Sequence, residues 1–186
     1  MSRIVAGVLG GRRLATPPGR GTRPTSDRVR EALFSALETM VDLDGARVAD
    51  LYAGSGAVGL EAASRGAAHV LLVEADPRAA RVTRENVANL GMREVARVAA
   101  AKVEQVLASP PPEPYDVVFA DPPYAMPETA INAMLTGLVK NGWLAEGAVV
   151  VVERSSRDAP PVWVEGITGE RSRRYGETTL WYGRGS

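Results

Sequence analysis

The chain has 186 residues, of which 45% are hydrophobic and 24% charged, and its formal net charge at pH 7 is zero. This balance is typical of one globular domain that buries a core without needing disulfides or a structural metal. The chain contains no cysteine and one histidine, which excludes Cys-ligated zinc, iron–sulfur clusters, thiolate nucleophiles and metal sites built from several histidines.

The amino-terminal segment concentrates positive charge, because residues 1–30 contain seven arginines and one acidic residue, Asp27. Such a segment on an otherwise acidic chain indicates an arm that contacts a polyanion, although a solvated basic tail is the plainer alternative. Gly10-Gly11, Pro17 and Pro18 predict a loop-rich stretch, with short strands possible at residues 4–8 and around Leu14.

A helix is predicted to begin after residue 25. Ser26 and Asp27 supply side chains for its N-cap, and apolar residues recur at three- and four-residue steps from Val29 to Met40. Arg28 and Arg30 fall away from this apolar stripe, so both are predicted to lie outside the buried face of the helix.

From residue 46 apolar strands alternate with amphipathic helices. Strands are predicted at residues 47–52, 70–74, 95–99, 116–120 and 148–153, and helices at 57–65, 77–90, about 103–107 and 128–139. Near-continuous apolar strands separated by helices are typical of parallel strands buried on both faces, which predicts an open α/β sheet. Residues 162–167 and 178–182 flank a polar loop at 169–174, and they predict an antiparallel hairpin that closes the sheet edge.

No apolar run approaches the ~18 residues of a membrane span, and the apolar stretch at residues 4–10 is too short for a signal peptide. We therefore expect a cytoplasmic protein without a membrane partner. We also expect a monomer without a bound metal. The lone histidine, His69, precedes an apolar strand and is interpreted as a strand-entry residue rather than a catalytic base.

A glycine-rich loop follows the first of these strands, with the sequence Gly54-Ser-Gly-Ala-Val-Gly59. Glycines between a strand and a helix let the backbone turn tightly and approach a bound ligand. The same spacing fits a dinucleotide site, because Glu74 stands 20 residues beyond Gly54, where a ribose-binding acid is expected. A glycine turn that binds no ligand is a further alternative.

Asp50 favours a different cofactor. Its carboxylate lies four residues before Gly54, where it suits a cationic sulfonium and an ammonium group better than a pyrophosphate. Glu74 can accept hydrogen bonds from both hydroxyls of a ribose. This pattern favours S-adenosylmethionine over a nicotinamide dinucleotide. The candidate contacts are Asp50, Ala53, Gly54, Ser55, Gly56 and Glu74.

The adenine of such a cofactor has no evident side-chain partner. Related sites often place a polar residue after the third strand, but here the sequence reads Ala99-Ala-Ala-Lys102. Backbone groups and apolar packing are therefore expected to hold the adenine.

The strand at 116–120 ends in Asp121-Pro-Pro-Tyr124, whose prolines fix their own φ angles and donate no backbone hydrogen bond. A turn that offers acceptors suits an exocyclic amine on a planar ring. The Asp121 carboxylate and the Pro122 carbonyl can accept its two N–H groups, while Pro123 stiffens the turn and Tyr124 offers a stacking face. A proline-stiffened loop without function is the alternative. Because ligands lie beyond the carboxyl ends of such strands, this turn and the glycine loop are predicted to border one crevice.

Residues along nearly the whole chain resemble the RsmD family of bacterial 16S rRNA guanine-N2 methyltransferases. The resemblance rests on RIVAGVLGGRRL (3–14), TRPTSDRVREALFSAL (22–37), DLYAGSGAVGLEAASRGA (50–67), FADPPY (119–124), NGWLAEGAVVVVE (141–153) and RRYGETTLWYG (173–183). The DPPY turn alone is shared with DNA adenine methyltransferases. Its combination with the basic arm and RPTSDRVRE is much more specific.

The resemblance implies an α/β, Rossmann-like class I methyltransferase domain at residues 26–186, preceded by an RNA-contacting extension at 1–25. The sheet would be mostly parallel and seven-stranded, with an antiparallel last strand. The implied reaction transfers a methyl group from S-adenosylmethionine to the exocyclic N2 of one guanine in 16S rRNA, either free or in a small-subunit particle. Asp121, Pro122, Pro123 and Tyr124 would hold the base. The arginines expected to contact RNA phosphates are Arg3, Arg12, Arg13, Arg23 and Arg28.

Three other functions stay open on the sequence alone. A DNA adenine-N6 methyltransferase could use the same turn, although the chain leaves little room for a separate target-recognition domain. A non-catalytic RNA-binding assembly factor could keep the fold as a scaffold, but Asp50, Glu74 and Asp121 argue against it. A nicotinamide dehydrogenase would need a hydride-transfer acid or base, and it would leave the DPPY turn without a role.

Overall fold

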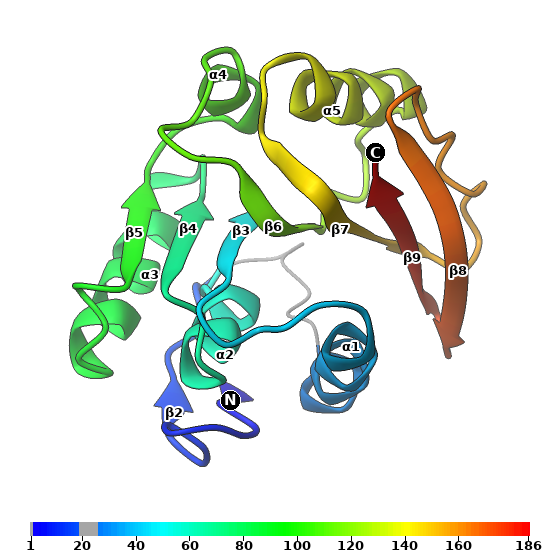
Figure 1. Cartoon of the computed structure of the whole chain (residues 1–186). Coiled ribbons are helices and arrows are strands. Elements are labelled where there is room, and N and C mark those ends of the chain that lie inside the picture. Colours follow the sequence, from blue (N-terminus) through cyan, green and yellow to red (C-terminus); the bar gives the residue numbers. More distant parts are fainter. Residues whose placement is uncertain (1, 19–25) are drawn as a thin grey trace.

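The computed structural model describes residues 2–18 and 26–186 (Figure 1). Its main strands are β3 (Arg47–Leu51), β4 (His69–Val73), β5 (Ala96–Ala99), β6 (Tyr115–Ala120), β7 (Leu144–Ser155), β8 (Ile167–Tyr175) and β9 (Thr178–Gly185). Its helices are α1 (Asp27–Met40), α2 (Ala57–Ser64), α3 (Pro77–Asn89), α4 (Val103–Leu107) and α5 (Glu128–Lys140). Two short strands, β1 (Ser2–Arg3) and β2 (Arg13–Leu14), form a separate antiparallel pair. No helix within the described ranges has the length and hydropathy needed to span a membrane.

The seven main strands form one sheet in the order β5-β4-β3-β6-β7-β9-β8. Neighbouring strands are parallel from β5 to β7, whereas β9 is antiparallel to both β7 and β8. The predicted Rossmann-like, mostly parallel sheet with an antiparallel last strand is therefore confirmed. His69 is the first residue of β4, as predicted.

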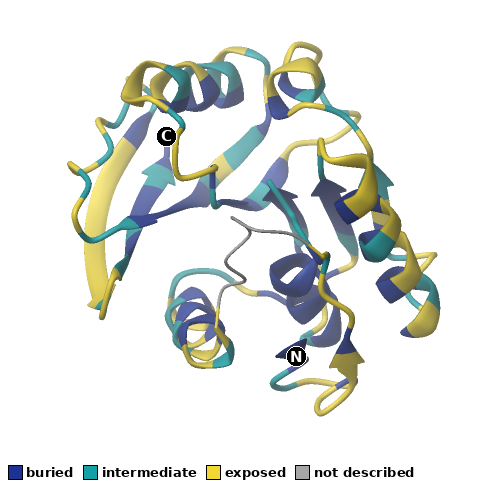
Figure 2. Ribbon diagram, turned by 180° about the vertical axis from the view of Figure 1, so that it is seen from behind, coloured by how far each residue is buried: buried dark blue, intermediate teal, exposed yellow. Residues whose placement is uncertain are grey.

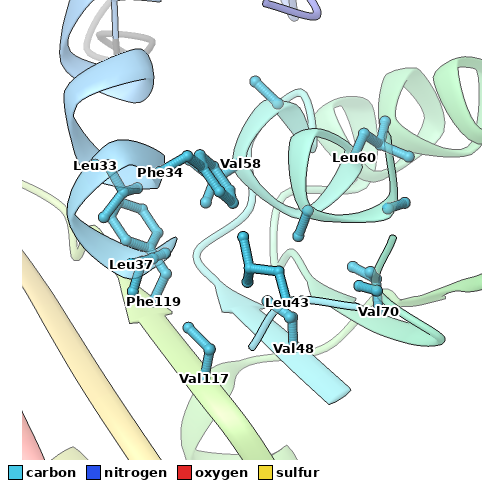
Figure 3. Close-up of a cluster of buried hydrophobic side chains, with 14 of the residues drawn as sticks. Leu33, Phe34, Leu37, Leu43, Val48, Val58, Leu60, Val70, Val117 and Phe119 are labelled. Atoms are coloured by element: carbon cyan, nitrogen blue, oxygen red, sulfur yellow. The ribbon is translucent and has the colours of Figure 1, made fainter. Parts of the chain in front are cut away.

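Two hydrophobic clusters cover the two faces of the sheet. Figure 3 shows Leu33 and Phe34 of α1 in the first cluster, on the face that α2 also covers. The helices α4 and α5 cover the opposite face (Figure 1). Alternate strand side chains point to opposite faces, so Val117 belongs to the first cluster and Val118 to the second. This alternation decides which strand residues reach the site described below.

The amino-terminal segment packs onto α2 rather than extending into solvent. Ile4, Leu9 and Leu14 are buried in the same cluster as α1 and α2. The amides of Val5 and Ala6 also donate hydrogen bonds of 2.8 Å and 3.0 Å to the two carboxylate oxygens of Glu61. The boundary between an extension and a catalytic domain at residue 25 stays a prediction, since residues 19–25 lie outside the described ranges.

Arg30 corrects the helix prediction, because its side chain is fully buried on the same helix face as Leu33 and Phe34. Its Nε donates to Glu61 at 3.2 Å, and its Nη2 donates to Asp27 at 2.9 Å and to the Arg3 carbonyl. A buried guanidinium is tolerated where carboxylates and carbonyls satisfy its donors. Arg30 thus joins α1, α2 and the amino-terminal segment, and it does not contribute to an exposed basic arm.

The carboxyl-terminal hairpin also differs from the prediction. Residues 169–174 lie within β8 instead of a loop, and the turn is formed by Gly176 and Glu177 between Tyr175 and Thr178. The predicted strand at 162–167 is wrong except at its last residue. The reason is visible in Figure 2, where β8 forms the exposed edge of the sheet. A charged edge strand lacks the apolar alternation on which the prediction relied. The strand predicted at 4–8 is likewise wrong, since β1 ends at Arg3.

Candidate active site

A cavity of about 820 Å³ opens at the carboxyl ends of the central strands. Its wall includes the glycine loop that follows β3 and the turn at residues 121–124 that follows β6. The two segments meet because β3 pairs directly with β6, with Asp50 opposite Phe119. The prediction that both motifs border one crevice is therefore confirmed.

The three glycines of the loop have different structural roles. Gly54 and Gly56 have φ angles of 59° and 85°, which a residue without a Cβ adopts at little cost. Gly54 lines the cavity, whereas Gly56 is the N-cap residue of α2 and does not reach the cavity wall. At Gly59 an added Cβ would lie 2.4 Å from Cδ2 of Leu72 and 2.8 Å from Cγ1 of Val70. The absence of a side chain at Gly59 therefore lets α2 pack closely on β4.

Asp50 is a buried acid on the cavity wall. It is 2% exposed, and its Oδ2 accepts a hydrogen bond of 2.9 Å from Gly59 N. Burial raises the pKa of the Asp50 carboxyl to about 8; the Gly59 hydrogen bond opposes this shift, and the charges of Glu74 and Glu153 add to it. A cationic ligand would favour the ionised carboxylate. The site therefore fits the positively charged part of S-adenosylmethionine.

Glu74 follows β4 and holds the glycine loop in place. Its Oε1 accepts a hydrogen bond of 2.7 Å from Gly54 N, and its Oε2 accepts one of 2.8 Å from Asp76 N. Each carboxylate oxygen can accept a second hydrogen bond. Glu74 can therefore bind the hydroxyls of a ribose in the cavity while it fixes the backbone around it.

The cavity has two halves. The half that contains Asp50, the glycine loop and Glu74 also includes residues 102–104, at the start of α4. The alanine run at 99–101, where the sequence pattern placed the adenine, does not reach the wall. The strand β5 ends at Ala99, and the chain reaches the cavity only after the following turn. Val103 is the apolar residue among these three, and Lys102 and Glu104 flank it.

Asn86 of α3 joins the amino-terminal segment to the glycine loop. Its Oδ1 accepts a hydrogen bond of 2.9 Å from Ala15 N, and its Nδ2 donates to the carbonyls of Ala15 and Ser55 at 3.0 Å and 2.9 Å. Thr16 and Pro17 consequently lie on the cavity wall beside the loop. No sequence pattern indicates this contact, because Asn86 belongs to an ordinary amphipathic helix.

The other half of the cavity is built around the turn at residues 121–124. Pro122 is buried, Asp121 is half-buried, and Tyr124 is 81% exposed. Met126 N donates a hydrogen bond of 2.9 Å to the Pro123 carbonyl and closes the turn. An exposed aromatic ring beside a carboxylate offers a flat stacking surface next to a hydrogen-bond acceptor.

Glu153 is a cavity residue that the sequence analysis missed. It lies near the end of β7 with 9% of its surface exposed, and it lines the cavity together with Asp121 and Asp50. The strands β6 and β7 are in register, with Ala120 opposite Val152, so the two acids follow at equivalent positions. Three carboxyl groups, those of Asp50, Asp121 and Glu153, thus line the cavity at the carboxyl ends of the neighbouring strands β3, β6 and β7.

The environment at the ends of β6 and β7 disfavours ionisation of Asp121. Burial raises the pKa of the Asp121 carboxyl well above its usual value, and the charges of Glu153 and Asp50 and a hydrogen bond with Glu153 raise it further. The positive charge of Arg154 opposes this shift. Two carboxyl groups this close favour a state in which they share one proton.

Tyr52 is a second cavity residue that the sequence did not indicate. Its φ angle is 61°, a left-handed conformation that is rare for an aromatic residue and recurs at functional sites. Its hydroxyl donates to Met126 Sδ at 3.6 Å, which connects the glycine loop with the segment after the proline turn. Burial raises the pKa of the Tyr52 hydroxyl to about 12, so this group stays a donor.

Four of the arginines predicted to contact RNA are described by the structure, and they lie outside the cavity. Arg3, Arg12, Arg13 and Arg28 are exposed, and Arg23 lies outside the described residues. The guanidinium of Arg12 donates a hydrogen bond of 2.9 Å to the carbonyl of Asn89. The four described arginines lie on the surface of the amino-terminal segment and α1, and none of their contacts tests a role in RNA binding.

The chain matches the family model named Conserved hypothetical protein 95 over residues 2–184. It is 40% identical over 161 residues to Ribosomal RNA small subunit methyltransferase D of Escherichia coli K12, covering 86% of this chain and 77% of the relative. It is 37% identical over 170 residues to the protein of the same name from Haemophilus influenzae, covering 89% of this chain and 84% of the relative.

Solved structures share the fold. The chain superposes on the protein yhhF of Escherichia coli with a TM-score of 0.87 and 33% identity, covering 99% of this chain and 97% of that one. An RNA methyltransferase of Salinibacter ruber, solved with S-adenosyl-L-homocysteine, has a TM-score of 0.65 and 20% identity, and covers 87% and 93% of the two chains. This second likeness supports the fold alone.

Proposed function

The chain belongs to the Conserved hypothetical protein 95 family and is 40% identical to a small-subunit rRNA methyltransferase, and we propose that it methylates the exocyclic N2 of one guanine in 16S rRNA. The protein is an S-adenosylmethionine-dependent methyltransferase. The proposal concerns the base, the atom that is methylated and the residues responsible. The shared cavity of the glycine loop and the proline turn is the observation that carries it.

The residues of the first half of the cavity fit the cofactor. Asp50 would bind its cationic part, Glu74 its ribose hydroxyls, and the backbone at Ala53, Gly54 and Ser55 would contact it closely. When bound, S-adenosylmethionine supplies a sulfonium methyl group, whose carbon–sulfur bond breaks with its electron pair on sulfur as the amine lone pair forms the new nitrogen–carbon bond. S-adenosylhomocysteine is the product that remains.

The residues of the second half would orient the amine. The lone pair of an exocyclic amine is delocalised into the ring, so the amine is a weak nucleophile. The Asp121 carboxylate and the Pro122 carbonyl would each accept one of its N–H groups, which draws electron density onto nitrogen and fixes its direction. Asp121 would then accept the proton that the amine loses. Pro123 would stiffen the turn, and Tyr124 would stack on the base.

The RNA backbone would be held outside the cavity. We assign this role to the exposed Arg3, Arg12, Arg13 and Arg28, and to Arg23. Extrusion of the target base from its stack requires a few kcal/mol, least where the base is unpaired. The substrate implies a cytoplasmic location, and a monomer suffices because one chain supplies both halves of the cavity.

Nucleoside mass spectrometry of 16S rRNA tests this function. Cells that lack the protein should lose one N2-methylguanosine, and the wild-type gene should restore it, whereas the Asp121→Ala variant should not. Purified protein should also label 16S rRNA or small-subunit particles, and not duplex DNA, from S-adenosylmethionine with a labelled methyl group. Methylation of adenine in duplex DNA would establish the rival function, and complete restoration by Asp121→Ala would refute the role of that carboxylate.

A further inference from the structure

Glu153 has no role in the reaction as described so far, yet it lies where the target base must enter. It is buried at the end of β7, lines the cavity, and stands beside Asp121 because β6 and β7 are adjacent and in register. A buried acid next to another acid is unfavourable unless a ligand or a shared proton compensates the repulsion. The carboxyl groups of Asp121 and Glu153 offer two hydrogen-bond acceptors side by side. They are complementary to a ligand edge that carries two hydrogen-bond donors side by side.

Guanine has such an edge. Its N1–H and N2–H groups are adjacent donors, whereas adenine presents an unprotonated N1 acceptor next to its N6 amine. A second carboxylate beside Asp121 would accept the N1–H of guanine and would repel the N1 lone pair of adenine. This complementarity gives Glu153 a chemical function that the reaction at N2 alone does not require.

On this basis, and resting on the function proposed above, we infer that Glu153 is a specificity-determining residue that reads the N1–H of the target guanine while Asp121 binds its 2-amine. Without a substrate, one shared proton relieves the repulsion between the two neighbouring acids, Asp121 and Glu153. Entry of guanine replaces the shared proton with two donors, and the proton leaves to solvent. Methyl transfer then releases one proton from the amine, which the carboxylate pair accepts, so the pair returns to its singly protonated state.

RNA carrying 2-aminopurine at the target position separates this role from a structural one. This base keeps the 2-amine that is methylated, but its ring N1 is an acceptor without a proton. The RNA is prepared with guanosine or 2-aminopurine at the mapped nucleotide and is presented in the form, free or in a particle, that the wild-type enzyme methylates. The measured quantity is kcat/KM for each RNA.

The wild-type enzyme should prefer guanosine by about tenfold or more, the discrimination typical of a site built around one hydrogen-bonded donor. In Glu153→Gln the side-chain amide can donate to the N1 of 2-aminopurine, so this preference should fall by about tenfold or reverse. Glu146→Gln, an exposed substitution at the other end of β7, should leave the preference unchanged.

Two results would overturn the inference: equal use of both RNAs by the wild-type enzyme, or an equal loss on both RNAs in Glu153→Gln. The first result does not depend on whether the variant folds. Failure of the proposed function is a distinct outcome, because the wild-type enzyme would then not methylate the guanosine RNA at all.

Discussion

The cavity has a cofactor half, around Asp50 and Glu74, and a base half, around Asp121 and Glu153. The two halves differ in the partners of their acidic groups. In the cofactor half, Glu74 accepts hydrogen bonds from Gly54 N and Asp76 N, and Asp50 accepts one from Gly59 N. These acids therefore fix the backbone of the loop. In the base half, by contrast, the carboxyl groups of Asp121 and Glu153 face each other across adjacent strand ends.

Under the function proposed above, this difference assigns cofactor binding and chemistry to different parts of one cavity. The cofactor half is organised by the chain's own backbone, so its shape does not depend on the RNA. The base half brings two acids together, and its electrostatics therefore change when a ligand with hydrogen-bond donors binds. We therefore expect substitutions in the two halves to affect different steps, and the following predictions test that division from the largest effect to the smallest.

Asp121→Asn should reduce methyl transfer about a thousandfold or more, a loss comparable to that of a donor in a preorganised site. The amide keeps the size of the side chain, but it offers one acceptor where the carboxylate offers two and places an N–H group toward the amine. Cofactor affinity, measured by calorimetry, should change by less than about threefold, since neighbouring carboxylates interact only moderately at this range. A matching loss of cofactor affinity would show that the two halves are not separable.

Gly59→Ala should destabilise the cofactor half by about 1–3 kcal/mol. The new methyl group would lie 2.4 Å from Leu72 Cδ2 and 2.8 Å from Val70 Cγ1, so α2 or β4 must shift. The measured quantity is the difference in the free energy of unfolding between variant and wild type, determined by urea denaturation. Gly137→Ala in α5 is the control, because its Cβ would lie 3.7 Å from the nearest atom, Leu107 Cβ. The free energy of unfolding of that variant should increase by about 0.5–1 kcal/mol, because alanine has less backbone entropy to lose on folding than glycine.

Tyr124→Ala should weaken RNA binding by about 1–3 kcal/mol, the contribution of one stacked base. The ring is 81% exposed, so its removal leaves the core intact, and the melting temperature should not change. Fluorescence anisotropy with labelled RNA measures the binding, and Tyr124→Phe should retain it. Unchanged binding by the alanine variant would remove the ring from the base half.

Asp50 should make cofactor affinity depend on pH. Burial raises its pKa to about 8 in the free protein, so at pH 7 the carboxyl is largely protonated and must release a proton when a cation binds. Affinity should therefore rise with pH up to about 8, by at most about tenfold per pH unit. Calorimetry in buffers of different ionisation enthalpy should detect the released proton, and Asp50→Asn should abolish the release.

The same pKa has the opposite consequence for the stability of the free protein. The ordinary value of the carboxyl is 3.8 and the folded value is about 8, so the folded state binds more protons than the unfolded state between these values. Its contribution to the free energy of unfolding therefore decreases as pH rises through this range. Asp50→Asn should flatten this dependence.

Arg13→Ala should have the smallest effect, because it removes one phosphate contact outside both halves. The slope of log affinity against log salt for RNA binding should decrease by about 0.7, with no change in the step that transfers the methyl group. Arg93→Ala, another exposed arginine outside the predicted arm, should leave the slope unchanged. An unaltered slope for Arg13→Ala would exclude this arginine from the RNA contact.

The sequence predicted the cofactor half and the proline turn because their signals are local. Gly54, Gly59 and Glu74 keep fixed spacings around a strand and a helix, and Asp121 follows its strand directly. Glu153 was missed because it ends a run of valines, and only the pairing of β6 with β7 places it beside Asp121. Val103 was missed for a similar reason, since the turn after β5 carries the chain past the alanines before it reaches the cavity.

The errors at Arg30 and β8 have a different physical origin. The charge of Arg30 favoured a surface position, but the residue shares the buried face of α1, where Glu61 and the backbone carbonyl of Arg3 are its partners. In β8, hydrogen bonding with β9 forms a strand from a charged sequence. Both outcomes depend on residues distant in the chain, which a pattern within one segment does not contain.

The most direct test is a crystal structure of the protein with S-adenosylhomocysteine and an RNA fragment that contains the target guanosine. The account predicts the guanine N2 within hydrogen-bonding distance of the Asp121 carboxylate, with the sulfur atom held on the side of Asp50 and Glu74. A guanine bound away from residues 121–124, or a cofactor outside the cavity, would contradict it.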